Sequence, residues 1–271
     1  QKRYMSPLFS VIIPTLNEEK YLPRLLADLH NQKMKNFEVV IVDGKSDDQT
    51  KVKAAQFGTV LPLIFLESKM RNVSFQRNLG AVKSRGEFLI FIDADCRINP
   101  TFTKRLQAFI EKQKGLLFLP YVDPEDSTPE TKAFYQLVNF VIQASQSFGK
   151  PLSSVGSIII QKNLFMQIGG FEEELYISED HNLIQKAKIW GVRAKPLNNI
   201  KIKFSFRRIR REGRFQSMYK LLVGTVYTLF KGDVKEKIFN YEMGGHLYRK
   251  KLTRKDKDVY LKQIKDFFSR Y

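Results

Sequence analysis

The chain has 271 residues, of which 43% are hydrophobic and 13% aromatic, and its formal net charge is +18. This length and apolar content are enough for a large α/β core and exclude a disordered chain. A single cysteine excludes an internal disulfide framework and is compatible with a reducing, cytoplasmic compartment. The basic start leads directly into a strand-like segment, so we expect no signal peptide.

The first half of the chain alternates short β-branched runs with longer amphipathic stretches. The predicted strands are 9–13, 37–42, 61–66 and 88–92, and the predicted helices between them are 18–31, 48–57, 73–84 and 101–113. This alternation predicts an α/β fold with a mostly parallel central sheet and helices on both faces. Ligands of such sheets bind beyond the carboxyl ends of the strands.

After Pro120 the pattern changes. The run "YVDPEDSTPET" is typical of a turn-rich connector, and an amphipathic helix is predicted from about 132 to 147. A strand at 155–161 and a short helix follow. We therefore expect the second half of the chain to complete the edge of the sheet at which the predicted strands end.

We divide the chain into two regions. Residues 1–205 are expected to form one domain, with a first half at about 8–120 and a second half at about 121–205. Residues 206–271 are expected to form a basic, helical extension. From residue 201 onwards the chain has 20 Lys and Arg against 7 Asp and Glu, so the positive charge is concentrated there. Such a tail can meet nucleic acid, anionic lipid or a phosphorylated substrate.

Two of the predicted strands end in polar residues. The first continues into "PTLNEE", which contains Asn17, and the second into "DGKSDD", which begins with Asp43. Asn17, and either Ser46 or Asp47, are most simply interpreted as N-caps of the following helices. Asp43 lies before the cap and ends an otherwise apolar strand. It is therefore a candidate binding residue.

The predicted strand 88–92 is followed by Asp93 and Asp95. On an extended backbone, an Asp-x-Asp pair places both carboxylates on the same side. Two such charges repel unless a cation or a proton lies between them, and Mg²⁺ or Mn²⁺ is the natural occupant. Because such an ion usually completes its shell with substrate phosphates and water, the pair predicts a phosphate-bearing substrate. In the alternative interpretation, one aspartate caps the next helix and the other is solvated.

In five segments, the chain resembles the family 2 glycosyltransferases of the GT-A fold. The matching segments, in order, are "SVIIPTLNEE" at 10–19, "FEVVIVDGKSDDQT" at 37–50, "NVSFQRNLGAVKSRGEFLIFIDADC" at 72–96, "GGFEEELYISED" at 169–180 and "FRRIRREG" at 206–213. The resemblance covers roughly residues 8–230. It implies transfer of a sugar from a nucleotide-diphosphate donor to an acceptor, usually with inversion.

The resemblance also implies a role for each matching residue on the donor side. Pro14, Thr15 and Glu18 would line the nucleotide pocket. Asp43 would hydrogen-bond the base or the ribose, and Arg77 would approach the nucleotide or its diphosphate.

The same resemblance places a divalent cation, Mg²⁺ or Mn²⁺, at the aspartate pair. Asp95 would bind the ion directly, while Asp93 would contact the ribose, the ion or its water. Some lipid-phosphate relatives have glutamine two residues after the second aspartate, where this chain has Arg97. Their exact ligand set therefore does not transfer to this chain.

On the acceptor side, Glu179 and Asp180 match the acidic pair of the family, and Asp180 is the candidate general base. A base must reach the acceptor hydroxyl rather than the metal. In the alternative interpretation, Ser178 and the acidic pair begin a helix, whose dipole favours negative charge. A phosphate acceptor, as in polyprenyl-phosphate sugar synthases, would need no strong base. His181 is either a ligand or a packed residue.

The segment after the core supplies Arg207, Arg208 and Arg211, which are candidates for closing over the donor diphosphate or holding an anionic acceptor. Residues 214–231 have the pattern of a basic amphipathic helix, which either lies on an anionic membrane or packs on the catalytic domain. We expect a cytoplasmic protein, peripheral on the inner face of the cell membrane if the extension binds lipid, with a lipid-linked acceptor as a hypothesis.

The sequence thus predicts a metal-dependent, inverting glycosyltransferase that moves one sugar from a UDP- or GDP-linked donor. A nucleotidyltransferase is a weaker alternative, because no glycine-rich phosphate loop follows the first strand. A nucleic-acid-binding protein is weaker still, since an acidic rim would repel a polyanion. We therefore expect no nucleic-acid partner.

Overall fold

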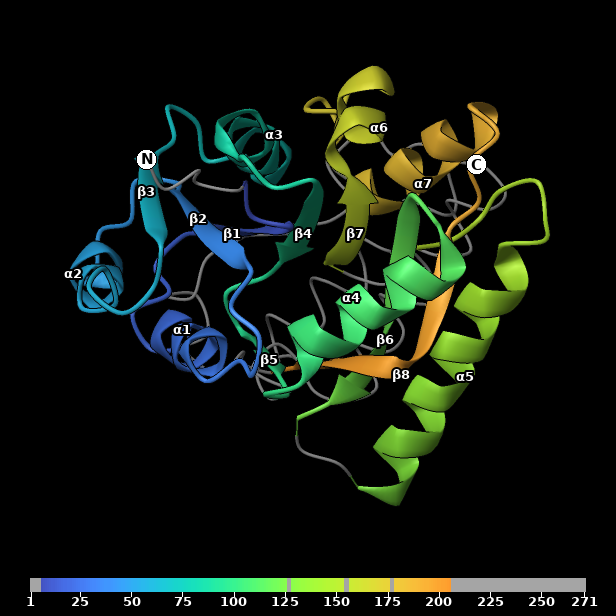
Figure 1. The fold of residues 1–271 in the computed structure, drawn as a ribbon, viewed down its shortest axis with the longest axis horizontal. Coiled ribbons are helices and arrows are strands. Elements are labelled where there is room, and N and C mark those ends of the chain that lie inside the picture. The colour runs from blue at the N-terminus through green and yellow to red at the C-terminus, as the bar shows by residue number, and fades with distance from the viewer. Residues whose placement is uncertain (1–5, 126–127, 154–155, 176–177, 206–271) are drawn as a thin grey trace, which may run out of the picture.

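The computed structural model describes residues 6–125, 128–153, 156–175 and 178–205 (Figure 1). Its strands are β1 (Phe9–Thr15), β2 (Phe37–Asp43), β3 (Leu63–Glu67), β4 (Phe88–Ile92), β5 (Cys96–Ile98), β6 (Leu117–Pro124), β7 (Ser157–Gln161) and β8 (Lys195–Phe204). Its helices are α1 (Leu22–His30), α2 (Thr50–Ala55), α3 (Val73–Lys83), α4 (Phe102–Gln113), α5 (Pro129–Ser145), α6 (Lys162–Gln167) and α7 (Glu179–Ile189). The described strands form one sheet in the order β3-β2-β1-β4-β7-β6-β8-β5.

The strands β3, β2, β1 and β4 are parallel, as the sequence predicts. In the pair β1–β2, Phe9 lies opposite Phe37 and Thr15 lies opposite Asp43, so the two strands end at the same edge. Every residue of β1, β2 and β4 is buried, which explains why these strands read as continuous apolar runs. The carboxyl ends of three central strands therefore meet at one rim.

The central strands pack helices on both faces, which confirms the predicted layers. Val11 and Ile13 of β1 belong to a core that includes residues of α1 and α4. Ile12, which points the other way, belongs to a second core with residues of α6 and α7. Figure 1 shows α3, α6 and α7 on one side of the sheet and α1 and α4 on the other.

The second half of the sheet was not fully predicted. β7 pairs antiparallel with β4 and with β6, and β5 pairs antiparallel with β8, while β6 and β8 are parallel. The expected turn-rich connector after Pro120 is wrong at its start, because β6 continues to Pro124. Pro120 lies at a shift of register between β6 and β8, where a missing backbone donor is tolerated.

Asn139 of α5 fixes this helix against β6. Its side chain donates to the carbonyl of Val122 at 2.8 Å and accepts from the amide of Val122 at 2.9 Å. The helix begins at Pro129, three residues earlier than predicted, because Thr128 and Thr131 form a reciprocal capping box. No described helix is both long and apolar enough to span a bilayer.

Candidate active site

The first polar cluster of the rim surrounds Asp43, at the end of β2. Its Oδ1 accepts from the Thr15 hydroxyl at 2.8 Å and from the Ser46 hydroxyl at 2.6 Å, and its Oδ2 accepts from the Ser46 amide at 2.8 Å. Asp43 is 4% exposed. Its carboxylate is therefore held in one orientation by hydrogen bonds from the chain itself.

The loops after β1 and β2 are bonded to each other. The Asn17 amide donates to the Ser46 hydroxyl at 2.8 Å, and the Asp47 amide donates to Asn17 Oδ1 at 2.7 Å. The interpretation of these residues as N-caps is therefore wrong, because the N-caps of α1 and α2 are Tyr21 and Gln49. Asn17 has a φ of 56°, a turn conformation that asparagine tolerates.

Pro14 and Glu18 are both buried beside this cluster. The Glu18 amide donates to the Thr50 hydroxyl at 2.8 Å, which ties the loop after β1 to the first turn of α2. Gln76 of α3, which sequence reasoning missed, donates through Nε2 to the Thr15 carbonyl at 3.0 Å and to the Val42 carbonyl at 2.7 Å. It satisfies two backbone acceptors where the parallel strands separate.

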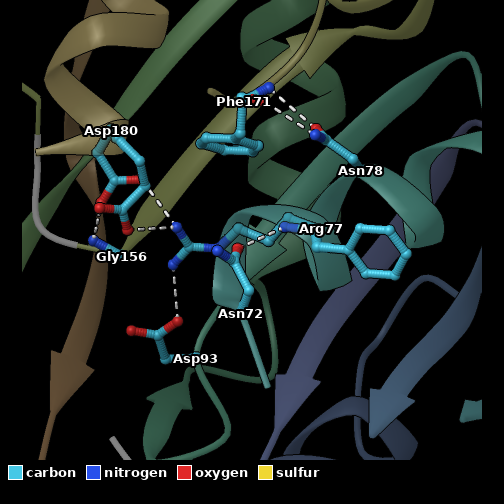
Figure 2. A network of polar contacts seen from close by, with 9 residues as sticks. Asn72, Arg77, Asn78, Asp93, Gly156, Phe171 and Asp180 are labelled. Atoms are coloured by element: carbon cyan, nitrogen blue, oxygen red, sulfur yellow. Dashed lines mark hydrogen bonds and ion pairs between the residues drawn. The ribbon is translucent and has the colours of Figure 1, made fainter. Parts of the chain in front are cut away.

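The second polar cluster is centred on Arg77, the next residue of α3 (Figure 2). Its Nη2 donates to Asp93 Oδ1 at 2.9 Å, and its Nη1 donates to Glu179 Oε1 and Asp180 Oδ1, both at 3.0 Å. The Arg77 side chain is 2% exposed. Asp93 follows β4, whereas Glu179 and Asp180 form the first turn of α7. One guanidinium thus joins the end of β4 to the start of α7.

The surroundings of Asp180 complete this cluster. Its Oδ2 accepts from the Gly156 amide at 2.9 Å. The ring of Phe171 lies with its centroid 5.2 Å from the guanidinium carbon of Arg77. Asn78 donates to the Phe171 carbonyl and accepts from the Phe171 amide, both at 2.9 Å. Sequence reasoning did not single out Gly156, Phe171 or Asn78, because Gly156 acts through its backbone, Phe171 through a packed ring, and Asn78 through bonds to the backbone of a distant residue.

The charges of this cluster do not cancel, because three carboxylates face one guanidinium. Burial and the neighbouring Asp180 together raise the pKa of the Glu179 carboxyl to about 7, against the lowering effect of Arg77. Burial alone would lower the pKa of the Arg77 guanidinium, but its carboxylate partners outweigh burial and raise it above the ordinary value. The site is therefore net negative.

His181 follows the acidic pair and packs beside it. Burial lowers the pKa of its imidazole to about 4, and its Nδ1 accepts from the Ser153 amide at 3.0 Å. The histidine is thus neutral at pH 7, with one ring nitrogen already bonded to the backbone. This geometry agrees with the interpretation of His181 as a packed residue.

Asp93 and Asp95 lie in a tight turn rather than on an extended backbone, as the Cys96 amide donates to the Asp93 carbonyl at 3.1 Å. The expected extended geometry is therefore wrong, because the chain reverses here to form β5. Both aspartates are half-buried. In the part of the chain that the structure describes, no group of three or more acidic, histidine or cysteine residues is arranged as a metal site.

Three residues predicted to approach the donor, Arg207, Arg208 and Arg211, lie outside the described residues. The remaining predicted site residues fall into the two clusters or the turn after β4. α3 connects the clusters, since its adjacent residues Gln76 and Arg77 reach one each.

Gly156→Ala is expected to lower the free energy of unfolding by about 2–4 kcal/mol. Gly156 has a φ of 69°, and a Cβ there would overlap Asp93 Oδ2. Thermal or urea unfolding measures this cost. Gly149→Ala is the matched control, because a Cβ at Gly149 meets nothing within 4 Å. Equal stabilities of the two variants would show that position 156 has room for a side chain.

Comparison with known proteins identifies the fold and then the family. A crystal structure of Staphylococcus aureus TarS 1–349 in complex with UDP-GlcNAc superposes with a TM-score of 0.61 at 22% identity, covering 98% of this chain and 72% of that chain. The mannosyltransferase PcManGT from Pyrobaculum calidifontis, in complex with GDP-Man and Mn²⁺, gives a TM-score of 0.62 at 19% identity, covering 81% of this chain and 65% of that chain. The fold is therefore the GT-A fold.

Residues 10–169, more than half of the chain, match the family described as "Glycosyl transferase family 2". The chain belongs to glycosyltransferase family 2, as its sequence motifs predict. The poly(ribitol-phosphate) beta-N-acetylglucosaminyltransferase TarS of S. aureus (strain Mu50 / ATCC 700699) is 30% identical over 220 residues, 77% of this chain and 37% of TarS.

A second relative is an uncharacterized glycosyltransferase of Haemophilus influenzae. It is 25% identical over 196 residues, which are 66% of this chain and 61% of the relative. The chain thus spans 61% of the length of this relative and 37% of the length of TarS.

Proposed function

We propose that residues 1–205 form the catalytic domain of a metal-dependent, inverting glycosyltransferase that moves one sugar from a UDP- or GDP-linked donor to an acceptor. The observation that carries this proposal is the pair of acidic clusters at the carboxyl ends of β1, β2 and β4, connected through α3. Family membership supports sugar transfer. The two structural neighbours bind UDP-GlcNAc and GDP-Man, which supports a nucleotide-sugar donor.

In this proposal the first cluster binds the nucleoside. Asp43 accepts from the base or ribose through the lone pair of Oδ2 that its bonds with Thr15 and Ser46 leave over, in a carboxylate orientation fixed beforehand. Pro14 and Glu18 form the wall of the pocket. Preorganised acceptors lower the entropy cost of ordering the nucleoside.

The turn after β4 has the donor set for a hard divalent ion, because Asp93 and Asp95 supply carboxylate oxygens from a net negative site. One or both carboxylates would hold the ion, and the donor diphosphate would complete its shell. When bound, Mg²⁺ or Mn²⁺ supplies Lewis-acid neutralisation of the departing diphosphate. Asp93 would contribute to holding the ion while its Oδ1 accepts from Arg77.

Asp180 is the proposed general base for the acceptor hydroxyl, with Glu179 beside it. Gly156 and Arg77 orient the two oxygens of Asp180 through single hydrogen bonds, so each oxygen keeps a lone pair for a proton. A buried, net negative site next to the base disfavours a phosphate acceptor. This charge favours a hydroxyl acceptor over the polyprenyl-phosphate alternative. The positive charge of residues 201–271 supports a lipid-linked acceptor at an anionic membrane surface as part of the proposal.

Thermal unfolding with UDP, GDP and dTDP, each with and without Mn²⁺, tests the donor site. A nucleotide at about 100 times its Kd stabilises the native state by about 2.7 kcal/mol, an increase of several degrees in Tm. We expect one nucleotide to stand out with Mn²⁺ and to lose this effect in Asp95→Ala. The control is Glu111→Gln, on the exposed surface of α4. No metal-linked increase in Tm with any nucleotide would contradict the proposed site.

A further inference from the structure

We propose that Arg77 is a positioning residue, which holds the ion-binding side and the acceptor side of the site at a fixed separation, and is not a ligand of the donor diphosphate. This inference rests on the proposed function. It assigns Arg77 differently from the family resemblance, which places it at the nucleotide. The reason lies in the geometry of its guanidinium.

The contacts of Arg77 run to two parts of the site that are far apart in sequence. Asp93 is 16 residues away, and Glu179 and Asp180 are 102 and 103 residues away. Figure 2 shows the guanidinium between the carboxylates of Asp93 and Asp180. Because α3 is anchored by Gln76 to the backbone at the ends of β1 and β2, the guanidinium reaches both carboxylate groups from a fixed base.

The guanidinium is not accessible to a diphosphate. The Arg77 side chain is 2% exposed, and both terminal nitrogens already donate to carboxylates. Its Nε is also buried and has no partner among the described residues. The Phe171 ring lies against the guanidinium, and Asn78 holds the backbone of Phe171 in place. A phosphate could reach Arg77 only if these contacts opened.

Charge explains why an arginine is required here. Without Arg77, the carboxylates of Asp93, Glu179 and Asp180 would repel one another across a buried site. The planar guanidinium donates in separate fixed directions to the two sides of the site, whereas a lysine ammonium is a single point of contact. Arg77→Lys therefore keeps the positive charge but cannot keep the hydrogen bonds to all three carboxylates at their present distances.

For catalysis, the distance between the ion-binding side and the acceptor side of the site matters more than the affinity for the donor. Asp180 must reach the acceptor hydroxyl while the ion-binding turn holds the diphosphate on the opposite side, and small errors in this geometry are costly. Loss of Arg77 should therefore lower kcat and leave nucleotide binding nearly unchanged. Loss of a residue that binds the donor directly would instead weaken nucleotide binding.

The test compares Arg77→Ala and Arg77→Lys with Arg85→Met as the matched control. Arg85 pairs with the buried Glu38 near the other ends of the strands, and its own side chain is 64% exposed. Two quantities are measured: the kcat for release of UDP or GDP from a saturating UDP- or GDP-sugar, and the Kd of the free nucleotide with Mn²⁺. Millimolar guanidinium is added to fill the space left in Arg77→Ala, with urea as its uncharged counterpart.

We expect Arg77→Ala to lower kcat by about 100-fold or more and Arg77→Lys by about tenfold, with the nucleotide Kd changed by less than about threefold. Guanidinium, but not urea, should restore part of the kcat of Arg77→Ala. Arg85→Met should retain the wild-type kcat. If Arg77→Ala does not fold, Arg77→Lys carries the same comparison, because it retains the charge.

Three results would overturn the inference in distinguishable ways. A nucleotide Kd that rises in step with the loss of kcat/KM would make Arg77 a donor ligand. Wild-type kcat in Arg77→Lys, or in both variants, would remove the requirement for the guanidinium geometry. A wild-type protein that neither binds nucleotide nor releases it from any donor would instead refute the proposed function, and the inference with it.

Discussion

Asp180→Asn is expected to lower kcat for sugar transfer by about 10²–10⁴-fold while the Kd of the nucleotide stays within a few-fold of wild type. The substitution removes the carboxylate that we propose as the general base. It also places an amide group where Asp180 now accepts from both Arg77 and Gly156. Among the described residues, the proposed nucleoside-binding cluster at Asp43 shares no hydrogen-bond partner with Asp180, so donor binding should persist.

Steady-state release of UDP or GDP measures this effect, together with titration of the nucleotide. The control is Glu111→Gln, which also replaces a carboxylate by an amide but lies on α4. Wild-type turnover in Asp180→Asn would exclude Asp180 as the base. That outcome would favour an acceptor that needs no deprotonation, such as a phosphate.

Glu179→Gln is expected to stabilise the protein at pH 8 relative to wild type, on the order of 2 kcal/mol, and to have little effect at pH 4.5. The pKa of Glu179 is raised from 4.5 to about 7 by burial and by Asp180. The folded state therefore keeps a proton that the unfolded state loses between these values. The contribution of Glu179 to stability is fully present below pH 4.5 and is lost as the pH rises through 7. Glutamine does not ionise, so the Glu179→Gln variant does not lose this stability as the pH rises.

Urea unfolding at the two pH values measures the difference for Glu179→Gln and for Glu111→Gln. Glu111→Gln is the control for replacing a carboxylate by an amide, because Glu111 lies on the exposed surface of α4. A Glu179→Gln variant that is less stable than wild type at pH 8 would show that the ion pair with Arg77 outweighs burial.

The parallel half of the fold was predictable because its strands carry their own signal. The runs at β1, β2 and β4 are continuous and apolar, since both faces of each strand are buried. β3 and β7 were also predicted, whereas β5 and β6 carry little signal. β6 contains Pro120 and Pro124, which indicate turns in a sequence, and β5 has only three residues. Their pairing depends on partners distant in the chain.

The candidate site was predictable in its residue types but not in its geometry. Asp43, Asp93 and the Glu179–Asp180 pair were found from strand ends and motif order. The mutual hydrogen bonds of Asn17 and Ser46 were missed, because cap residues and loop-bridging residues are chemically the same. The resemblance implied that Arg77 approaches the nucleotide, which stays a prediction; its burial among carboxylates, on which we base the positioning role, has no signal in the sequence.

Release of UDP or GDP from UDP-GlcNAc, UDP-glucose and GDP-mannose tests the central claim most directly. The wild type, Asp95→Ala and the control Arg85→Met are each assayed in Mn²⁺ and in EDTA. We predict turnover of at least one donor by the wild type and by Arg85→Met in Mn²⁺, with about a 100-fold or greater loss in EDTA and in Asp95→Ala. Equal turnover by Asp95→Ala and the wild type, or turnover unaffected by EDTA, would contradict the proposed ion-dependent site.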